Sequence, residues 1–506
     1  MPAELIETLC RQLGARRVET HISWVLLFGD EALKIKKPVN LGFLDFSTLA
    51  RRHAMCEEEL RLNRRLAPAL YRDVLPITGS ASAPRLGGSG APIEWALRMH
   101  RFADDALLAD RLRHGDVRPA QIDRLAQRLA AFHRDAGVAD AASAYGCPER
   151  IAADTAAVIG RLAEHLGPAQ APALAALREW AATQARALHA TWLARRREGC
   201  VREGHGDLHA GNVVVLGDDV TAFDCIEFDP ALRWIDLQAD IGFLVMDLLA
   251  HERRDLAFRF LDRYLGEGGD HAGTAVLRYY LVYRALVRAL VATLRPGPAS
   301  GPDYLGLALR WLQPPGARLM ITHGYSGSGK SHAAAALLEQ AGAIRLRSDL
   351  ERKRLHGLSA LQRSDSGLDS GLYAAQASQA TYARLAVLAG IALGAGWPVI
   401  VDAAFLQAAE RERFRQLARE QGVPFTILHC EAPPQLLRER LAARARRADD
   451  ASEADAAVLA HQLGHAEPLD AREQRDQLCV DSARPDDPAA WAALAAAWIN
   501  AACVTR

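Results

Sequence analysis

A glycine-rich turn between an apolar strand and an alanine-rich helix constrains the fold of this chain most strongly. Residues 319–322 form the apolar run, residues 324–331 read GYSGSGKS, and residues 332–338 have the composition of a helix. Glycines let successive backbone amides wrap a phosphate group, and the helix N-terminus adds its positive dipole end. The pattern predicts a phosphate-binding P-loop at the head of a parallel α/β sheet.

The residues of this loop have separate expected roles. Lys330 is expected to reach the β- and γ-phosphate oxygens, and Ser331 is expected to ligate Mg²⁺. The remaining phosphate contacts are assigned to five loop residues, Gly324, Ser326, Gly327, Ser328 and Gly329. ATP and Mg²⁺ are therefore the expected cofactors.

Three features downstream of the loop indicate what it does with a nucleotide. An extended segment ends in Asp349, which is expected to orient a substrate hydroxyl as a general base. An apolar run, residues 399–402, ends in Asp402, which suits a second magnesium partner. A basic helical stripe, residues 438–447, is expected to close over the triphosphate through Arg440 and Arg444.

Each of these features also has a second interpretation. Asp349 could instead cap a helix that begins near Leu350, and Asp402 could be a turn residue at a strand end. The arginine stripe could be a solvated helix face, or the arginine finger of a nucleotide-gated switch.

A second constellation lies far upstream of the P-loop. Residues 205–212 read HGDLHAGN, and Asp224 follows at the end of a hairpin. Asp207 is expected to accept or orient the proton of an attacking hydroxyl. Asn212 and Asp224 supply hard oxygen ligands for Mg²⁺, and the hairpin brings both of them to one end.

The N-terminal hundred residues contain partners for this constellation. The second of two predicted strands, residues 24–28 and 32–36, carries Lys34, which is expected to pair with ATP phosphates. Glu59, on a helix predicted over residues 48–66, resembles the glutamate that positions this lysine in phosphotransferases.

Neighbouring residues compete for these two assignments. Lys36 lies on the same strand face as Lys34, and Glu57 and Glu58 neighbour Glu59. Lys34 could also be an ordinary solvated strand lysine. No G-x-G-x-x-G loop precedes these strands, because residues 19–23, ETHIS, occupy that place.

Two families resemble these two regions. Residues 205–240 resemble the catalytic segment of aminoglycoside phosphotransferase (APH)-like kinases, with HGDLHAGN standing for HRDLxxxN and Asp224 for the Asp of DFG. In this resemblance Asp240 is the residue that supports the catalytic loop. Residues 317–500 resemble AAA-type P-loop kinases of the gluconate kinase, zeta-toxin and polynucleotide-kinase type. The resemblances imply a fusion of two ATP-dependent phosphotransferase modules.

Composition narrows the class of protein and of partner. The chain has 506 residues, enough for several domains, and its 61 basic residues balance 61 acidic ones. This balance argues against general nucleic-acid or membrane-surface binding. Its eight cysteines contain no C-x-x-C pair, so neither a zinc site nor a disulfide framework is predicted. We expect a cytoplasmic protein, without a signal peptide or a membrane span.

The expected architecture combines α/β and α+β domains. A two-lobed protein-kinase-like fold is predicted to comprise an N-lobe over residues 1–102 and a helical C-lobe with the catalytic loop over residues 103–295. A linker rich in proline and glycine, residues 296–316, precedes a three-layer P-loop domain over residues 317–506.

The predicted function is phosphorylation of a small-molecule hydroxyl, such as that of a sugar, an amino sugar or a similar alcohol. Both sites are expected to bind nucleotide, and either both are catalytic or one regulates the other. The same residues also fit a nucleotide-gated switch, or a kinase that phosphorylates nucleotide or RNA ends. The sequence contains no legible acceptor motif and no signal for ATP over GTP or for an oligomeric state.

Overall fold

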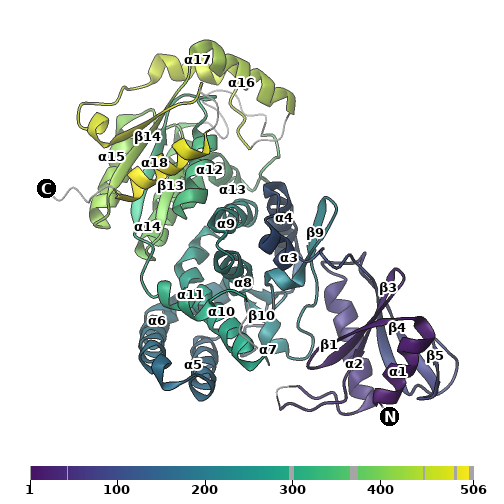
Figure 1. Ribbon diagram of the computed structural model, residues 1–506. Helices are drawn as coiled ribbons and strands as arrows, with labels where there is room; N and C mark the ends of the chain where they lie inside the picture. Colours follow the sequence, from purple (N-terminus) through teal and green to yellow (C-terminus); the bar gives the residue numbers. More distant parts are fainter. Residues whose placement is uncertain are drawn as a thin grey trace. The chain divides into compact units, whose positions relative to one another are not determined.

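The computed structural model describes residues 2–42, 44–295, 301–364, 374–447, 451–483 and 487–500 (Figure 1). By their internal contacts, Met1–Ile151 and Trp192–Asp247 form one unit, and Ala152–Thr191 and Leu248–Arg506 form a second. Residues 296–300 of the predicted linker lie outside the described residues. The bounds of the four predicted segments remain predictions.

The first unit contains a six-stranded antiparallel sheet of order β1-β2-β3-β6-β4-β5. Its strands are β1 (Arg16–Glu19), β2 (Ser23–Phe28), β3 (Glu31–Lys36), β4 (Tyr71–Ser80), β5 (Ala83–Leu86) and β6 (Glu94–His100). The helices that lie wholly or mainly in this unit are α1 (Pro2–Leu13), α2 (Leu49–Asn63), α3 (Leu108–His114), α4 (Pro119–Asp135), α7 (Pro230–Arg233) and α8 (Leu237–Ala250).

Strand alternation decides which side chains of β3 face α2. Leu33 and Ile35 are fully buried in a cluster with Leu5, Ile6 and Leu9 of α1. Because neighbouring strand residues point to opposite faces, Lys34 and Lys36 lie on the other face of the sheet. That face meets Glu59 of α2.

Residues 205–212, HGDLHAGN, form a short segment between two small two-stranded sheets. It lies between β7 (Val201–Glu203), which pairs with β10 (Trp234–Asp236), and the hairpin of β8 (Val213–Leu216) and β9 (Asp219–Ala222). A 3-10 turn over Ala210–Asn212 leads directly into β8. The predicted hairpin therefore forms, with Gly217 at a φ of 65° in its turn.

The second unit contains a five-stranded parallel sheet of order β12-β13-β11-β14-β15. The strands are β11 (Arg318–His323), β12 (Ile344–Arg347), β13 (Pro398–Asp402), β14 (Phe425–Glu431) and β15 (Gln477–Asp481). β13 is buried along its whole length and β11 along all but its first residue, as expected for a sheet covered on both faces. The P-loop follows the central strand β11.

The second unit wholly or mainly contains twelve helices among the described residues. They are α5 (Pro148–His165), α6 (Ala171–Arg197), α9 (Arg254–Gly268), α10 (Thr274–Leu294), α11 (Tyr304–Arg310), α12 (Lys330–Ala341), α13 (Ser348–Leu355), α14 (Ala375–Gly394), α15 (Ala408–Glu420), α16 (Pro434–Arg447), α17 (Ala456–His465) and α18 (Pro488–Asn500). Helix α12 contacts α18, α14 contacts α15, and α12, α14 and α15 all contact the sheet. The predicted three-layer fold class is confirmed.

Helices that precede the linker in sequence pack within this second unit. The Trp397 indole is fully buried, donates a hydrogen bond of 2.9 Å to the Thr274 carbonyl, and lies against the rings of Phe258 and Trp311. Helix α9 also contacts α12 and β12. The P-loop sheet thus shares its core with α9 and α10.

Candidate active sites

The N-terminal site is built around a buried cluster of lysines and carboxylates. Lys34 Nζ donates hydrogen bonds to Glu59 Oε1 at 2.7 Å and to Asp224 Oδ1 at 2.5 Å. Lys36 Nζ lies behind it and contacts Glu59 Oε2 at 2.7 Å and the Glu227 carboxylate. The structure thus brings Lys34, Glu59 and Asp224 together, and Lys34 is only 13% exposed, so it is not a solvated strand lysine.

Electrostatics explain why these charges persist in a buried place. Burial alone would raise the pKa of Glu59, but Lys34 and Lys36 outweigh it and hold the pKa below its usual range. Burial raises the pKa of Glu227, although Lys36 opposes this shift. Two lysines therefore face three carboxyl groups in this buried cluster.

The neighbouring glutamates of α2 have other partners. Glu58 pairs with Arg61 and with Arg233 at 2.7 Å each, and Glu57 lies 3.5 Å from His53 at the surface. Glu59 is therefore the glutamate of α2 that meets the β3 lysines.

Asp207 and Asn212 form the second part of this site. The Asn212 amide nitrogen donates to the Asp207 carbonyl at 3.0 Å and to its Oδ2 at 2.9 Å. His209 Nε2 lies 3.4 Å from the same carboxylate oxygen. Because the amide nitrogen is committed to Asp207, the Asn212 side-chain oxygen is the atom suited to a metal.

Asp240 ties the catalytic segment to α8. Its carboxylate accepts backbone N–H bonds from His205 at 2.7 Å and from Gly206 at 2.9 Å, and it meets His133 Nε2 at 3.0 Å. Burial would raise the pKa of Asp240, but His133 and these hydrogen bonds hold it well below its usual range.

The backbone of Asp224 adopts a φ of 65°, a strained conformation that Asp tolerates better than most residues.

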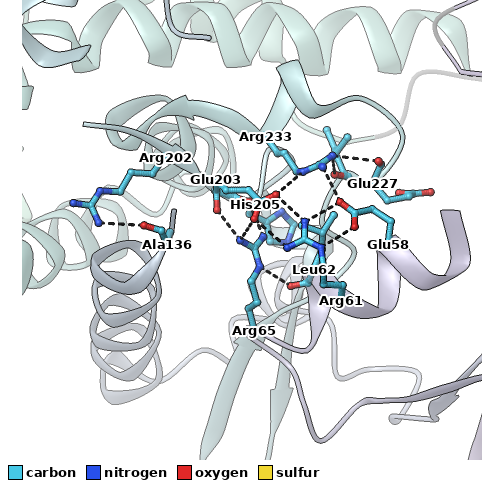
Figure 2. Close-up of polar contacts among 12 residues, drawn as sticks. Glu58, Arg61, Leu62, Arg65, Ala136, Arg202, Glu203, His205, Glu227 and Arg233 are labelled. Atoms are coloured by element: carbon cyan, nitrogen blue, oxygen red, sulfur yellow. Dashed lines mark hydrogen bonds and ion pairs between the residues drawn. The ribbon is translucent and has the colours of Figure 1, made fainter. Parts of the chain in front are cut away.

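A charge network joins α2 to the start of the catalytic segment, as Figure 2 shows. Glu203, at the end of β7, accepts hydrogen bonds from Arg61 at 2.8 Å and Arg65 at 3.0 Å, both on or just after α2. Arg233 donates to Glu203 at 3.3 Å and to Glu58 at 2.7 Å. Sequence reasoning missed this network, because Glu203 and the arginines of α2 lie far apart along the chain.

A β-hairpin tip occupies the place of the absent glycine-rich loop. Between β1 and β2, Thr20 closes the tip by bonding Ser23 through backbone and side chain. Lys37 Nζ bonds the Thr20 carbonyl at 2.6 Å and Glu19 at 2.7 Å, and lies over the Trp24 ring. Side-chain hydrogen bonds therefore fix the conformation of this tip, whereas a glycine-rich loop relies on the conformational freedom of glycine.

The C-terminal site is a cavity of about 1520 Å³ at the P-loop. Nine of the predicted residues line it: Ser326, Gly327, Gly329, Lys330, Ser331, Asp349, Asp402, Arg440 and Arg444. The other two, Gly324 and Ser328, lie within the loop itself. At Gly324 a Cβ would come within 2.5 Å of the Cys430 carbonyl oxygen, so only glycine fits there.

The P-loop places Lys330 and the first turn of α12 at the cavity. Lys330 Nζ donates to the Tyr325 carbonyl at 2.7 Å across the loop, and burial lowers its pKa. Gly329, at a φ of 86°, caps α12 and exposes the first amides of that helix. The Ser328 hydroxyl is buried without a hydrogen-bond partner among the described residues.

The residues present fit Mg²⁺. Ser331 Oγ donates to Asp402 Oδ1 at 3.2 Å, and Asp402 is only 4% exposed. Its Oδ2 has no hydrogen-bond partner in the part of the chain that the structure describes. A buried carboxylate oxygen in that state suits a hard cation, so Asp402 is no mere turn residue.

Asp349 and the arginines of α16 line the same cavity as the loop. Asp349 lies in the first turn of α13, whose N-cap is Arg347, so it does not cap that helix. Arg440 donates to the Gly327 carbonyl at 3.2 Å and to Ser482 Oγ at 2.8 Å. Arg444 reaches the Ala454 carbonyl at 2.6 Å. Arg440 and Arg444 of the arginine stripe therefore face the P-loop cavity of their own chain.

Sequence reasoning also missed Arg345 as part of this site. Its guanidinium bridges the Ser331 carbonyl, at 2.9 Å, and both carboxylate oxygens of Asp262 on α9. An arginine in a strand pattern gives no local signal of a partner 83 residues away.

Comparison with known proteins gives the following matches. Residues 319–469 match the family described as an AAA domain. The "Uncharacterized protein Rv2004c" of Mycobacterium tuberculosis is 30% identical over 449 residues, covering 87% of this chain and 89% of that protein. The "Uncharacterized protein Mb2027c" of Mycobacterium bovis matches to the same extent.

Two solved structures are also similar in part. A gluconokinase from Sinorhizobium meliloti 1021 is 23% identical, covering 37% of this chain and 91% of its own, with a TM-score of 0.25. An ethanolamine kinase from Plasmodium vivax is 10% identical, covering 59% of this chain and 80% of its own, with a TM-score of 0.36.

No helix among the described residues is both long enough and apolar enough to cross a membrane. With 30% identity over 87% of its length, the chain belongs to the family of these mycobacterial proteins, and its residues 319–469 match the AAA domain family.

Proposed function

We propose that this protein transfers the γ-phosphoryl group of ATP to a hydroxyl group of a small molecule, such as a sugar, an amino sugar or another alcohol. Both sites are proposed to be catalytic. One observation carries the proposal: at the C-terminal site Lys330, Ser331, Asp402 and Asp349 line a single cavity of about 1520 Å³. Pockets for one small ligand usually occupy about 300–1,000 Å³, so this cavity has room for a nucleotide and an acceptor.

The roles at the C-terminal site follow from position. The P-loop amides and Lys330 would hold the phosphates, and Arg440 would neutralise charge on them during transfer. Asp349, in the same cavity, would accept the proton of the acceptor hydroxyl as its oxygen attacks. Mg²⁺, when bound to Ser331 and Asp402, supplies charge neutralisation at the phosphate oxygens.

The roles at the N-terminal site are proposed in parallel. Lys34, fixed by Glu59, would hold ATP phosphates, and Asp207 would orient the acceptor hydroxyl. Asn212 and Asp224 would hold Mg²⁺. The hairpin tip at Thr20 would cover the phosphates where other kinases use a glycine-rich loop.

ATP consumption in the presence of sugars, aminoglycosides, amino alcohols, nucleosides and short RNA ends tests this proposal. Wild type, Asp207→Asn and Asp349→Asn are compared with each acceptor. We expect acceptor-stimulated turnover that one variant loses and the other keeps, which assigns that acceptor to one site. Lys330→Ala is measured beside them. Turnover that no acceptor stimulates, and that only Lys330→Ala abolishes, would reject transfer in favour of a nucleotide switch.

A further inference from the structure

Arg345 occupies an unusual position beside the proposed C-terminal metal site. It lies on β12, is 9% exposed, and donates from Nε and Nη2 to the two carboxylate oxygens of Asp262 at 3.1 and 2.7 Å. Its Nη1 donates to the Ser331 carbonyl at 2.9 Å. The same Nη1 stands only 3.7 Å from Asp402 Oδ2.

A guanidinium at this place competes with a metal. Asp402 Oδ2 is a buried oxygen without a hydrogen-bond partner among the described residues, and a cation is what would satisfy it. Arg345 and Mg²⁺ are both cations, so each stabilises the same carboxylate. As long as Asp262 holds the guanidinium in a two-bonded fork, Arg345 stays beyond hydrogen-bond distance of Asp402.

The surroundings give Arg345 room to move if that fork is lost. A cavity of about 350 Å³ is lined by Asp262, Ser331, Arg345 and Arg347, among others. Arg347 Nε lies 3.9 Å from Asp402 Oδ2, so the carboxylate already stands near a second guanidinium. A guanidinium released by Asp262 therefore has both the space and the electrostatic reason to approach Asp402.

Helix α9 also fixes Asp262 relative to the P-loop helix. Arg259 pairs with Glu339 of α12 at 2.9 Å, and Arg254 donates to the Ala341 carbonyl at the end of α12 at 3.2 Å. The first turn of α12 is held through Arg345 and the Ser331 carbonyl. Helix α9 thus contacts the C-terminal end of α12 directly, and it is connected to the first turn of α12 through Arg345.

We propose that Asp262 is a positioning residue of the C-terminal site: it restrains Arg345 and so keeps Asp402 available for the metal. The inference rests on the proposed function of that site. In this inference α9, a helix that precedes the linker, contributes to metal binding by the P-loop domain.

Direct metal binding tests the inference. The full chain carries Asp224→Asn, which removes the N-terminal metal ligand, and Mn²⁺ binding with a non-hydrolysable ATP analogue is followed by electron paramagnetic resonance. Asp262→Asn is expected to weaken Mn²⁺ binding about 10-fold, the loss typical of removing a partner that orients a metal ligand. Binding of the analogue without metal is expected to change less than about twofold.

Three further variants make the result specific. Asp262→Glu keeps a carboxylate for Arg345 and is expected to retain most of the Mn²⁺ affinity. Asp262→Asn with Arg345→Met removes the competing cation and is expected to recover it. Asp255→Asn is the matched control, because this carboxylate on the same helix pairs with Arg253.

Two results would overturn the inference alone. One is unchanged Mn²⁺ affinity in Asp262→Asn, and the other is a loss that Arg345→Met fails to recover. No acceptor takes part in this measurement, so the inference would stand even if no acceptor were found. A different result would overturn both the inference and the proposed function. In that result the wild-type protein binds no Mn²⁺–nucleotide, or the Lys330→Ala variant binds it equally well.

Discussion

At the residue scale, the two lysines of β3 have different tasks although they share one face of the strand. Lys36 is 1% exposed and lies between Glu59 and Glu227, whereas Lys34 also reaches Asp224. We predict that Lys36→Met lowers the free energy of unfolding by about 3 kcal/mol or more, because it leaves buried carboxylates without their partner. Lys34→Met is predicted to lower N-terminal turnover about 100-fold with a smaller loss of stability, since it removes charge neutralisation from the transition state.

Urea unfolding and ATP turnover of both variants check this contrast. The reverse pattern, with Lys36→Met inactive yet stable, would make Lys36 the phosphate-binding lysine.

At the element scale, the network around Glu203 sets the position of α2 and therefore of Glu59. Three arginines surround the Glu203 carboxylate, which is 11% exposed at the side chain. We predict that Glu203→Gln lowers the free energy of unfolding by about 3 kcal/mol, because Arg65 loses its carboxylate partner and only Glu58 remains to pair with Arg61 and Arg233. Faster hydrogen exchange in α2 and a higher KM for ATP are expected to accompany this loss.

Glu57→Gln is the matched control on α2, since Glu57 is 54% exposed and lies beside His53. A surface pair of this kind contributes about 0–1 kcal/mol, so both readouts should stay near wild type. Equal effects of the two substitutions would contradict a special role for Glu203.

Local motifs predicted the element types well, and distant pairings poorly. The strand, loop and helix around the P-loop form as predicted, because glycine chemistry and apolar runs act over a few residues. The same holds for the hairpin after HGDLHAGN. Arg345 with Asp262, and Glu203 with the arginines of α2, were missed, because a long side chain's partner is chosen by the fold and has no periodic signature.

At the scale of the whole molecule, the helices before the linker matter for the P-loop sheet. Trp397 is fully buried and bonds the Thr274 carbonyl, and Arg345 depends on Asp262. We predict that a fragment of residues 317–506 unfolds at a lower temperature, or aggregates, compared with a fragment of residues 248–506. Exposure of the Trp397 side chain alone costs about 3 kcal/mol.

Differential scanning calorimetry of the two fragments checks this prediction. Equal melting temperatures would mean that α9 and α10 do not support the sheet. The predicted domain start at residue 317 would then be sufficient for folding.

The most direct test of the account follows the label from γ-³²P-ATP into product. With a suitable acceptor, wild type is expected to form labelled phosphoester, and one of Asp207→Asn or Asp349→Asn should lose that product while the other retains it. Label released only as inorganic phosphate, at a rate that no acceptor changes, would contradict phosphoryl transfer to a small-molecule hydroxyl.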